Sequence, residues 1–261
     1  MPASPTSRAK GATRASESLA GLIARLADNK YFLGRRYAEW CSSAPTLESS
    51  VAAAAMAQDE LGHARALYPV LKTLLPGSAL EADPETRSAW VRFSMLDRDF
   101  AGWPDFIAAN FLLDTALSIV FEAAQTSTFE PLAGRSRKVL QEERNHWLHG
   151  EGWVRRLARD DTAARAALLA SLRATWDEVL CWFGPAGKSD PLAAEGVLDA
   201  TADELRARFL ARVAPLITTA KLAMPVAATA RGGWRLTRSL PWDRWDTATW
   251  RLREEGAGDV E

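Results

Sequence analysis

The sequence has little cysteine: Cys41 and Cys181 are the two cysteines among its 261 residues. Two cysteines so far apart form neither a disulfide framework nor a zinc-binding cluster, and such usage is typical of a reducing cytoplasm. An excess of charge of either sign is also missing, because the formal net charge is -1 and the pI is about 6.4. The sequence therefore gives no electrostatic reason to expect nucleic acid or an anionic membrane as a partner.

Long apolar runs are missing as well, and we find none that approaches the roughly 20 residues needed to span a membrane. The start of the chain, MPASPTSRAKGATRASES, is small, polar and basic, without the apolar stretch of a secretory signal. We expect residues 1–14 to form a disordered tail and residues 15–255 to form a single helical domain in the cytoplasm. The 11 tryptophans indicate a large core or buried contacts with partner subunits.

Alternating β-branched residues, the pattern of strands, are almost absent, and Ala, Leu, Arg and Glu dominate instead. The sequence therefore predicts an all-α protein. Apolar residues at helical spacing predict helices over residues 15–41, 46–74, 103–129, 135–159, 163–183 and 200–222. The remaining segment, RGGWRLTRSLPWDRWDTATWRL, is rich in Trp and Arg. It either wraps the bundle, which we favour, or docks on a partner.

Histidine is scarce too, and two of the three histidines share one pattern. Glu60 and His63 lie three residues apart on the apolar face of the second predicted helix, and Glu143 and His146 repeat this spacing on the fourth. Residues at i and i+3 share a helix face, so each pair can direct a carboxylate and an imidazole at one point. Two such helices, with carboxylates from two others, form the ferritin-like di-iron or di-manganese centre.

Charged groups on these apolar faces would be costly to bury unless a partner neutralised them. A metal ion is one such partner, and Asp114, on the inward face of the third predicted helix, is the natural carboxylate to join the set. The alternative is a buried network of ion pairs with Arg65 or Arg144. We expect Glu122 and His149 to lie beside the centre or at the surface. The predicted metal ligands are Glu60, His63, Asp114, Glu143 and His146.

The first predicted helix should supply one more ligand, and here the pattern departs from a standard centre. In an antiparallel hairpin that turns near Pro45, the inward position facing Glu60 is Lys30. Asp28 points about 200° round the helix and Glu39 lies about 13–14 Å along its axis, so neither replaces it. Three carboxylates and one ammonium leave two negative charges, which one divalent ion balances and a pair does not. We therefore expect fewer metal ions than in a di-iron protein, unless Lys30 is neutral.

Three stretches, LADNKYFLGRRYAEWCSSAPTLE, QDELGHAR and EERNHWLHGEGWVRRL, resemble the phenylacetic acid catabolic family. This family comprises the A and C subunits of bacterial phenylacetyl-CoA 1,2-epoxidase, and the resemblance extends over about residues 18–252. It implies a ferritin-like four-helix bundle with additional C-terminal helices. The first stretch looks like the structural C subunit, whereas the Glu-x-x-His motifs look like the catalytic A subunit. Matched to that catalytic subunit, the five predicted ligands take ligand positions, and Lys30 stands where the remaining glutamate would be.

The resemblance implies O₂ activation at iron and transfer of one oxygen atom to an aromatic acyl-CoA, with electrons from a reductase. It also implies a homo- or hetero-oligomer with a homologous ferritin-like subunit. Three functions remain open: an oxygenase subunit, a non-catalytic structural partner with an altered metal site, and a stand-alone redox or ferritin-like protein. In the oxygenase, Lys30 is a candidate proton donor to bound oxygen.

Overall fold

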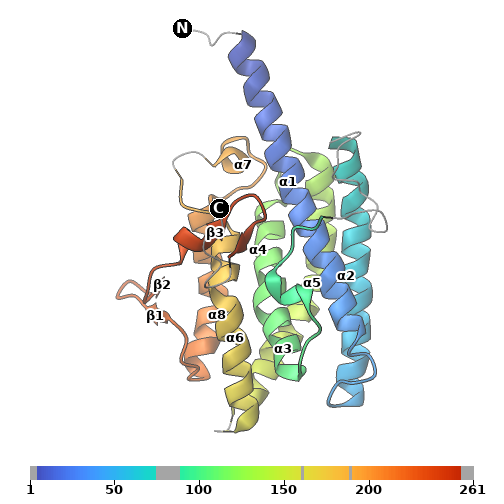
Figure 1. Ribbon diagram of the computed structural model, residues 1–261, viewed down its shortest axis with the longest axis vertical. Coiled ribbons are helices and arrows are strands. Elements are labelled where there is room, and N and C mark those ends of the chain that lie inside the picture. The colour runs from blue at the N-terminus through green and yellow to red at the C-terminus, as the bar shows by residue number, and fades with distance from the viewer. Residues whose placement is uncertain (1–4, 75–88, 160–161, 188–189, 254–261) are drawn as a thin grey trace, which may run out of the picture.

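The computed structural model describes residues 5–74, 89–159, 162–187 and 190–253. Long helices lie side by side as a bundle, with one helical hairpin on one side and two further helices on the opposite side (Figure 1). The prediction of an all-α, ferritin-like bundle with additional C-terminal helices is confirmed. The longer helices are α1 (Pro5–Ala38), α2 (Leu47–Leu74), α3 (Trp103–Ala108), α4 (Thr115–Ala123), α5 (Glu130–Leu157), α6 (Ala163–Trp182) and α8 (Ala202–Thr219).

The helix boundaries follow local capping chemistry more closely than the apolar periodicity. α1 begins at Pro5, so it extends into the segment that we expected to be a disordered tail. α5 begins at Glu130 because a proline occupies its first turn, where a missing N–H costs nothing. Thr201 and Glu204 form a capping box at the start of α8, in which each side chain meets the other residue's backbone N–H.

The third helix of the bundle is interrupted, whereas the sequence predicted a continuous one. Residues Ala109–Asp114 form a π-helical turn between α3 and α4. A π turn accommodates an extra residue, and such turns occur frequently at functional sites. Because one residue corresponds to about 100° of rotation, the turn shifts the faces of α3 and α4 relative to each other. The apolar periodicity gave no sign of this, since every residue of the turn is buried.

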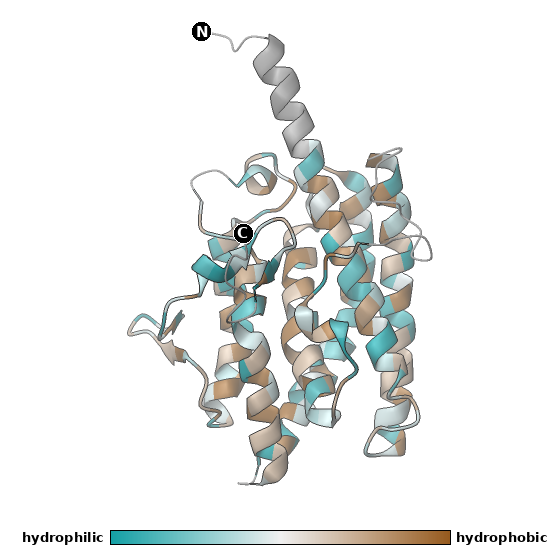
Figure 2. Ribbon diagram, in the orientation of Figure 1, coloured by the Kyte–Doolittle hydropathy of each residue, from teal (hydrophilic) through white to brown (hydrophobic). Residues whose placement is uncertain are grey.

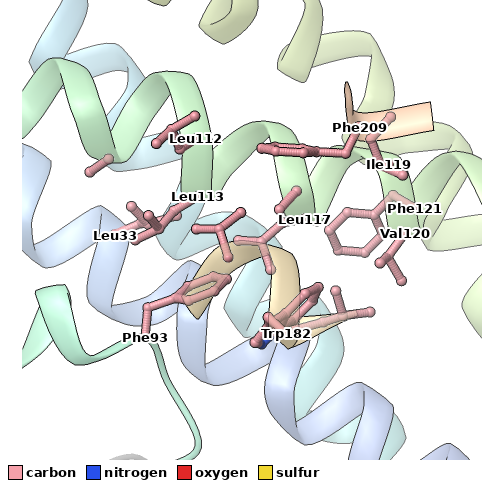
Figure 3. Packing of buried hydrophobic residues seen from close by; sticks show 14 of the residues in the cluster. Leu33, Phe93, Leu112, Leu113, Leu117, Ile119, Val120, Phe121, Trp182 and Phe209 are labelled. Atoms are coloured by element: carbon pink, nitrogen blue, oxygen red, sulfur yellow. The ribbon is translucent and has the colours of Figure 1, made fainter. Parts of the chain in front are cut away.

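This third helix is also the centre of the hydrophobic core. Trp103–Ala123 is long and apolar enough to cross a membrane, with a mean hydropathy of 1.6, but 94% of its most apolar window is buried inside the fold. This corrects our expectation that no apolar run approaches that length: two aspartates and one glutamate interrupt the run, but its mean hydropathy stays high. Hydrophobic residues follow this helix in Figure 2, and side chains from α1, α6 and α8 surround it in Figure 3.

The hairpin of α1 and α2 is packed closely. A Cβ atom at Gly34 would lie 2.8 Å from Cγ of Leu61 and 3.1 Å from the carbonyl oxygen of Ala57. Only glycine therefore allows the two backbones to approach this far at that point. The close approach fixes the register of the hairpin, which brings Lys30 of α1 opposite Glu60 of α2.

The C-terminal segment lies on the bundle, as we favoured. The Trp250 indole N–H donates to the carbonyl oxygen of Trp182 at 2.7 Å, and Arg251 forms an ion pair with Asp97 at 2.7 Å. Residues 226–252 contain two short antiparallel strand pairs. The short elements are η1 (Ser94–Asp97), α7 (Pro191–Ala194), β1 (Val226–Ala228), β2 (Trp234–Leu236), η3 (Trp242–Arg244), β3 (Trp245–Asp246) and β4 (Arg251–Leu252).

Candidate metal centre

The bundle brings most of the predicted ligands to one buried point. One ligand atom from each of Glu60, Asp114, Glu143 and His146 lies within 4.8 Å of the others, and all four residues are buried. Glu60 comes from α2, Asp114 ends the π turn, and Glu143 and His146 come from α5. The fifth residue, His63, lies at the edge of this group, with Nδ1 at 3.4 Å from Oε1 of Glu143 and 3.8 Å from Oε2 of Glu60.

Lys30 lies among these carboxylates rather than beside them. Its Nζ is 2.6 Å from Asp114, 2.6 Å from Glu143 and 2.9 Å from Glu60, and its side chain is fully buried. An ammonium has three N–H donors, and each of them here meets a carboxylate oxygen. The structure therefore contains the buried ion-pair network that was the alternative to a metal. Its cation is Lys30, however, whereas Arg65 and Arg144 are both exposed.

The charges of this cluster hold the lysine in its protonated form. Burial alone would lower the pKa of the Lys30 amine, but the three carboxylates outweigh burial and hold the pKa well above its ordinary value. For Asp114, burial opposes ionisation, but the positive charges of Lys30 and His146 hold the pKa well below its ordinary value. Burial and the charge of Asp114 raise the pKa of Glu143 to about 7. A neutral lysine is therefore disfavoured in the metal-free protein.

Both histidines meet an acidic residue from the opposite helix of the α2–α5 pair. Nε2 of His63 lies 2.6 Å from Oε2 of Glu142, and Nε2 of His146 lies 3.3 Å from Oδ2 of Asp59. Histidines that bind metal almost always donate their other ring N–H to such a group, which fixes the tautomer and ring orientation. Because these contacts use Nε2, the Nδ1 atoms of both histidines face the carboxylates of the centre. We did not predict Asp59 or Glu142, although the repeat of an acid before each motif glutamate was visible in the sequence.

Further polar side chains fix the positions of the cluster. Ser118 donates to Oε2 of Glu143 at 2.7 Å. Asn110, in the π turn, donates to the carbonyl oxygen of His146 at 3.1 Å, and its own Oδ1 lies 3.0 Å from Nδ1 of His149. A Cβ at Gly150 would lie 2.9 Å from that amide oxygen, so glycine is needed for α5 to approach the π turn.

The two residues expected beside the centre have distinct partners. Burial and the nearby His146 lower the pKa of His149 to about 4, so its ring is neutral and contacts Asn110 instead of the carboxylates. Glu122 forms a two-point ion pair with Arg212 at 2.8 and 3.0 Å. This pair lines a cavity of 670 Å³ that reaches inward to Asp114, Ser118, Glu143 and His146. The cavity is of the size that small-molecule ligands occupy.

The donor set suits a divalent metal, but it does not suit a pair of ions. Carboxylate and imidazole donors converge, and two buried polar atoms at the centre, Oε2 of Glu60 and Nδ1 of His63, have no hydrogen-bond partner among the described residues. The position of the remaining carboxylate ligand is taken by the Lys30 ammonium, which contacts all three carboxylates. A second divalent ion would meet this positive charge where a standard centre supplies a negative one.

Comparisons with known proteins extend over this whole region. The profile of a family described as "Phenylacetic acid catabolic protein" matches residues 5–237 of the chain. The chain is also similar to the C subunit of the 1,2-phenylacetyl-CoA epoxidase of Escherichia coli (strain K12). The two are 28% identical over 219 residues, which correspond to 80% of this chain and 85% of that protein. Lys30 and all the residues of the centre lie within the range matched by the family.

Proposed function

Because this chain belongs to the phenylacetic acid catabolic protein family, we propose that it is a subunit of a phenylacetyl-CoA epoxidase-type multicomponent oxygenase. The similarity to one subunit of a known epoxidase supports a place in an assembly of several chains. A homologous ferritin-like subunit is then the partner, a reductase supplies electrons, and an aromatic acyl-CoA is the substrate of the assembly. We expect the assembly in the cytoplasm, in keeping with the reduced cysteines.

Within such an assembly, the geometry supports the role of a structural partner best. The observation that carries this role is the bonding of Lys30 to all three carboxylates of the centre. A chain that activates O₂ at two metal ions needs those carboxylates for the ions. Here one oxygen of each carboxylate is bonded to an internal cation and is not free for a second ion, so the catalytic work falls to the homologous partner.

The convergence of metal donors favours a second candidate, an oxygenase subunit with its own metal. Glu60, Asp114, Glu143 and His146 would hold the ion, and iron, when bound, supplies O₂ activation for oxygen transfer. Ser118 would orient Glu143, and the 670 Å³ cavity would bring the substrate beside it. The proton-donor role of Lys30 belongs to this candidate, and it requires the ammonium to leave one of its three carboxylates.

Reconstitution separates the two candidates. The chain is co-expressed with the catalytic subunit of a phenylacetyl-CoA epoxidase, and the complex is purified through a tag on one chain only. We expect the two chains to co-purify and, with a reductase, to consume phenylacetyl-CoA. We expect this chain with the reductase alone to consume none. Turnover without the catalytic subunit would establish the second candidate, whereas failure to co-purify would contradict the proposed assembly.

A further inference from the structure

We infer that this centre binds a single divalent metal ion, held by Glu60, Asp114, Glu143 and His146, and that the Lys30 ammonium permanently takes the place of a second ion. The inference deepens the proposed function and rests on it for the class of metal. It adds one statement to that function: the subunit holds one metal ion, rather than two ions or none.

The size of the donor group matches one coordination sphere. The four donor atoms all lie within 4.8 Å of one another. Atoms bound to one ion at about 2.0–2.2 Å are separated by at most about 4.4 Å, so a small contraction brings all four onto the same ion. Nδ1 of His146 is already 2.9 Å from Oδ2 of Asp114, whose other oxygen, Oδ1, is the one bonded to Lys30. Such a separation is typical of neighbouring ligands on one ion.

The lysine side of the centre is closed to a second ion. Ions in two-metal sites lie about 3.5–4 Å apart and share carboxylates between them. Nζ of Lys30 contacts an oxygen of every carboxylate, at 2.6 to 2.9 Å, so the oxygens that a second ion would share are already bonded. Since the side chain is fully buried and all three N–H groups are bonded, no movement toward solvent frees these oxygens without breaking the network.

The charges of the side chains in the centre also favour a single divalent ion. With both histidines neutral, as imidazole ligands of a metal are, the three carboxylates and the Lys30 ammonium leave two negative charges, and one divalent ion neutralises them. Arg65 and Arg144, the cations nearest in sequence to the motifs, are exposed, and Arg144 lines the outer cavity. A second divalent ion would leave two positive charges in a buried site, and the further anions Asp59 and Glu142 contact only the far ring nitrogens of the histidines.

Two features of the described structure indicate that a ligand belongs at this point. Oε2 of Glu60 is buried and has no hydrogen-bond partner among the described residues. Asp59 lies against Nε2 of His146, the arrangement that turns the other ring nitrogen of a histidine toward a metal. A protonated His146 between Asp114 and Asp59 would also satisfy the second feature, but an ion-pair network around Lys30 leaves Oε2 of Glu60 without a partner.

Counting ions on the isolated chain tests this inference. Protein freed of metal with a chelator is titrated with Mn²⁺, and bound metal is measured by calorimetry and by elemental analysis. We expect one ion per wild-type chain and none in Asp114→Asn. We expect two in Lys30→Glu, which restores the missing carboxylate. Lys138→Glu makes the same charge change at an exposed position of α5, and it should still bind one ion.

Electron paramagnetic resonance of the Mn²⁺-loaded wild type gives a readout that does not depend on a variant folding. We expect the signal of an isolated ion, and exchange coupling between two ions only in the glutamate variant. Two coupled ions in the wild type would overturn the inference, as would the absence of any bound Mn²⁺. Neither result bears on co-purification with a catalytic subunit, so failure here remains distinct from failure of the proposed function.

Discussion

Replacing Lys30 with methionine is the sharpest test of the charge arrangement. Methionine is apolar and of similar length, so Lys30→Met removes the ammonium and leaves the three carboxylates buried with one cation fewer. The lysine makes three charge-assisted hydrogen bonds, at 2.6, 2.6 and 2.9 Å, and all four residues are buried. Removing one partner from a buried ion-pair network costs about 3–5 kcal/mol of unfolding free energy, because the other charges lose their compensation.

Urea denaturation in the presence of a chelator measures this cost without interference from metal. With an unfolding slope of about 2–3 kcal/mol per molar urea, the midpoint should fall by about 1–2 M at pH 7. Lys138→Met, at an exposed position of α5, is the matched control and should change stability by less than about 0.5 kcal/mol. Addition of Mn²⁺ should then restore part of the lost stability in the Lys30 variant, since an ion that binds only the folded state stabilises it.

The pH dependence of this difference has a definite sign. In the wild type the pKa of Asp114 is held well below its ordinary value, so its contribution to stability is present at neutral pH and is lost as pH falls through the folded pKa. In Lys30→Met the carboxylates can relieve their repulsion by taking up protons, which is easier at low pH. The difference between the proteins should therefore be larger at pH 8 than at pH 5. Equal stability at pH 8 would refute the account of Lys30 as the compensating charge.

Other predictions concern packing and protonation. Gly150→Ala should lower the unfolding free energy by about 1–3 kcal/mol because its methyl group would lie 2.9 Å from a buried amide oxygen, whereas Gly152→Ala, with nothing within 4 Å, should raise it slightly. Gly34→Ala should lower the unfolding free energy at least as much, because backbone atoms of the facing helix lie within 3.1 Å of the added methyl group. Gly62→Ala, where nothing lies within 4 Å, is the control on that helix. Thermal denaturation of the four variants measures each difference. The ring of His149 should stay neutral down to about pH 4, so stability should fall as pH drops from about 6.5 toward 4; NMR titration would contradict this if the ring gained its proton near pH 6.5.

Helical periodicity and one turn were enough to place Lys30. Once the hairpin turns near Pro45, the geometry of the two helices decides which residue faces Glu60, and the structure confirms the lysine at that position. The same periodicity placed Asp114 and both Glu-x-x-His pairs on inward faces. These successes have a common cause: each depends only on a position along one helix and on the side that the core occupies.

The features missed from the sequence depend on contacts between helices. Arg65 and Arg144 were the candidate cations of the alternative ion-pair network, but both side chains are exposed. The cation came instead from α1, far away in the chain. The contacts of Asp59 with His146 and of Glu142 with His63 likewise join α2 to α5. They depend on how close the two helices lie, and the residue pattern of one helix does not specify that distance.

The π turn could not be predicted for a different reason. It lies in a segment where every residue is buried, so no polar face marked the change of register. The turn is stabilised by contacts that Asn110 makes with α5, and these depend on the absence of a side chain at Gly150. A regular helix is the natural expectation from propensity alone, and tertiary packing overrides it here.

The burial of Trp103–Ala123 has a consequence for how the protein is made. During translation this apolar helix leaves the ribosome before α5, α6 and α8, which cover much of it, have been synthesised. Until they arrive, the nascent chain presents a stretch that hydrophobicity alone does not distinguish from a membrane span. Chains that terminate prematurely after this helix should therefore engage chaperones or aggregate, and synthesis that slows just beyond it would prolong the exposure.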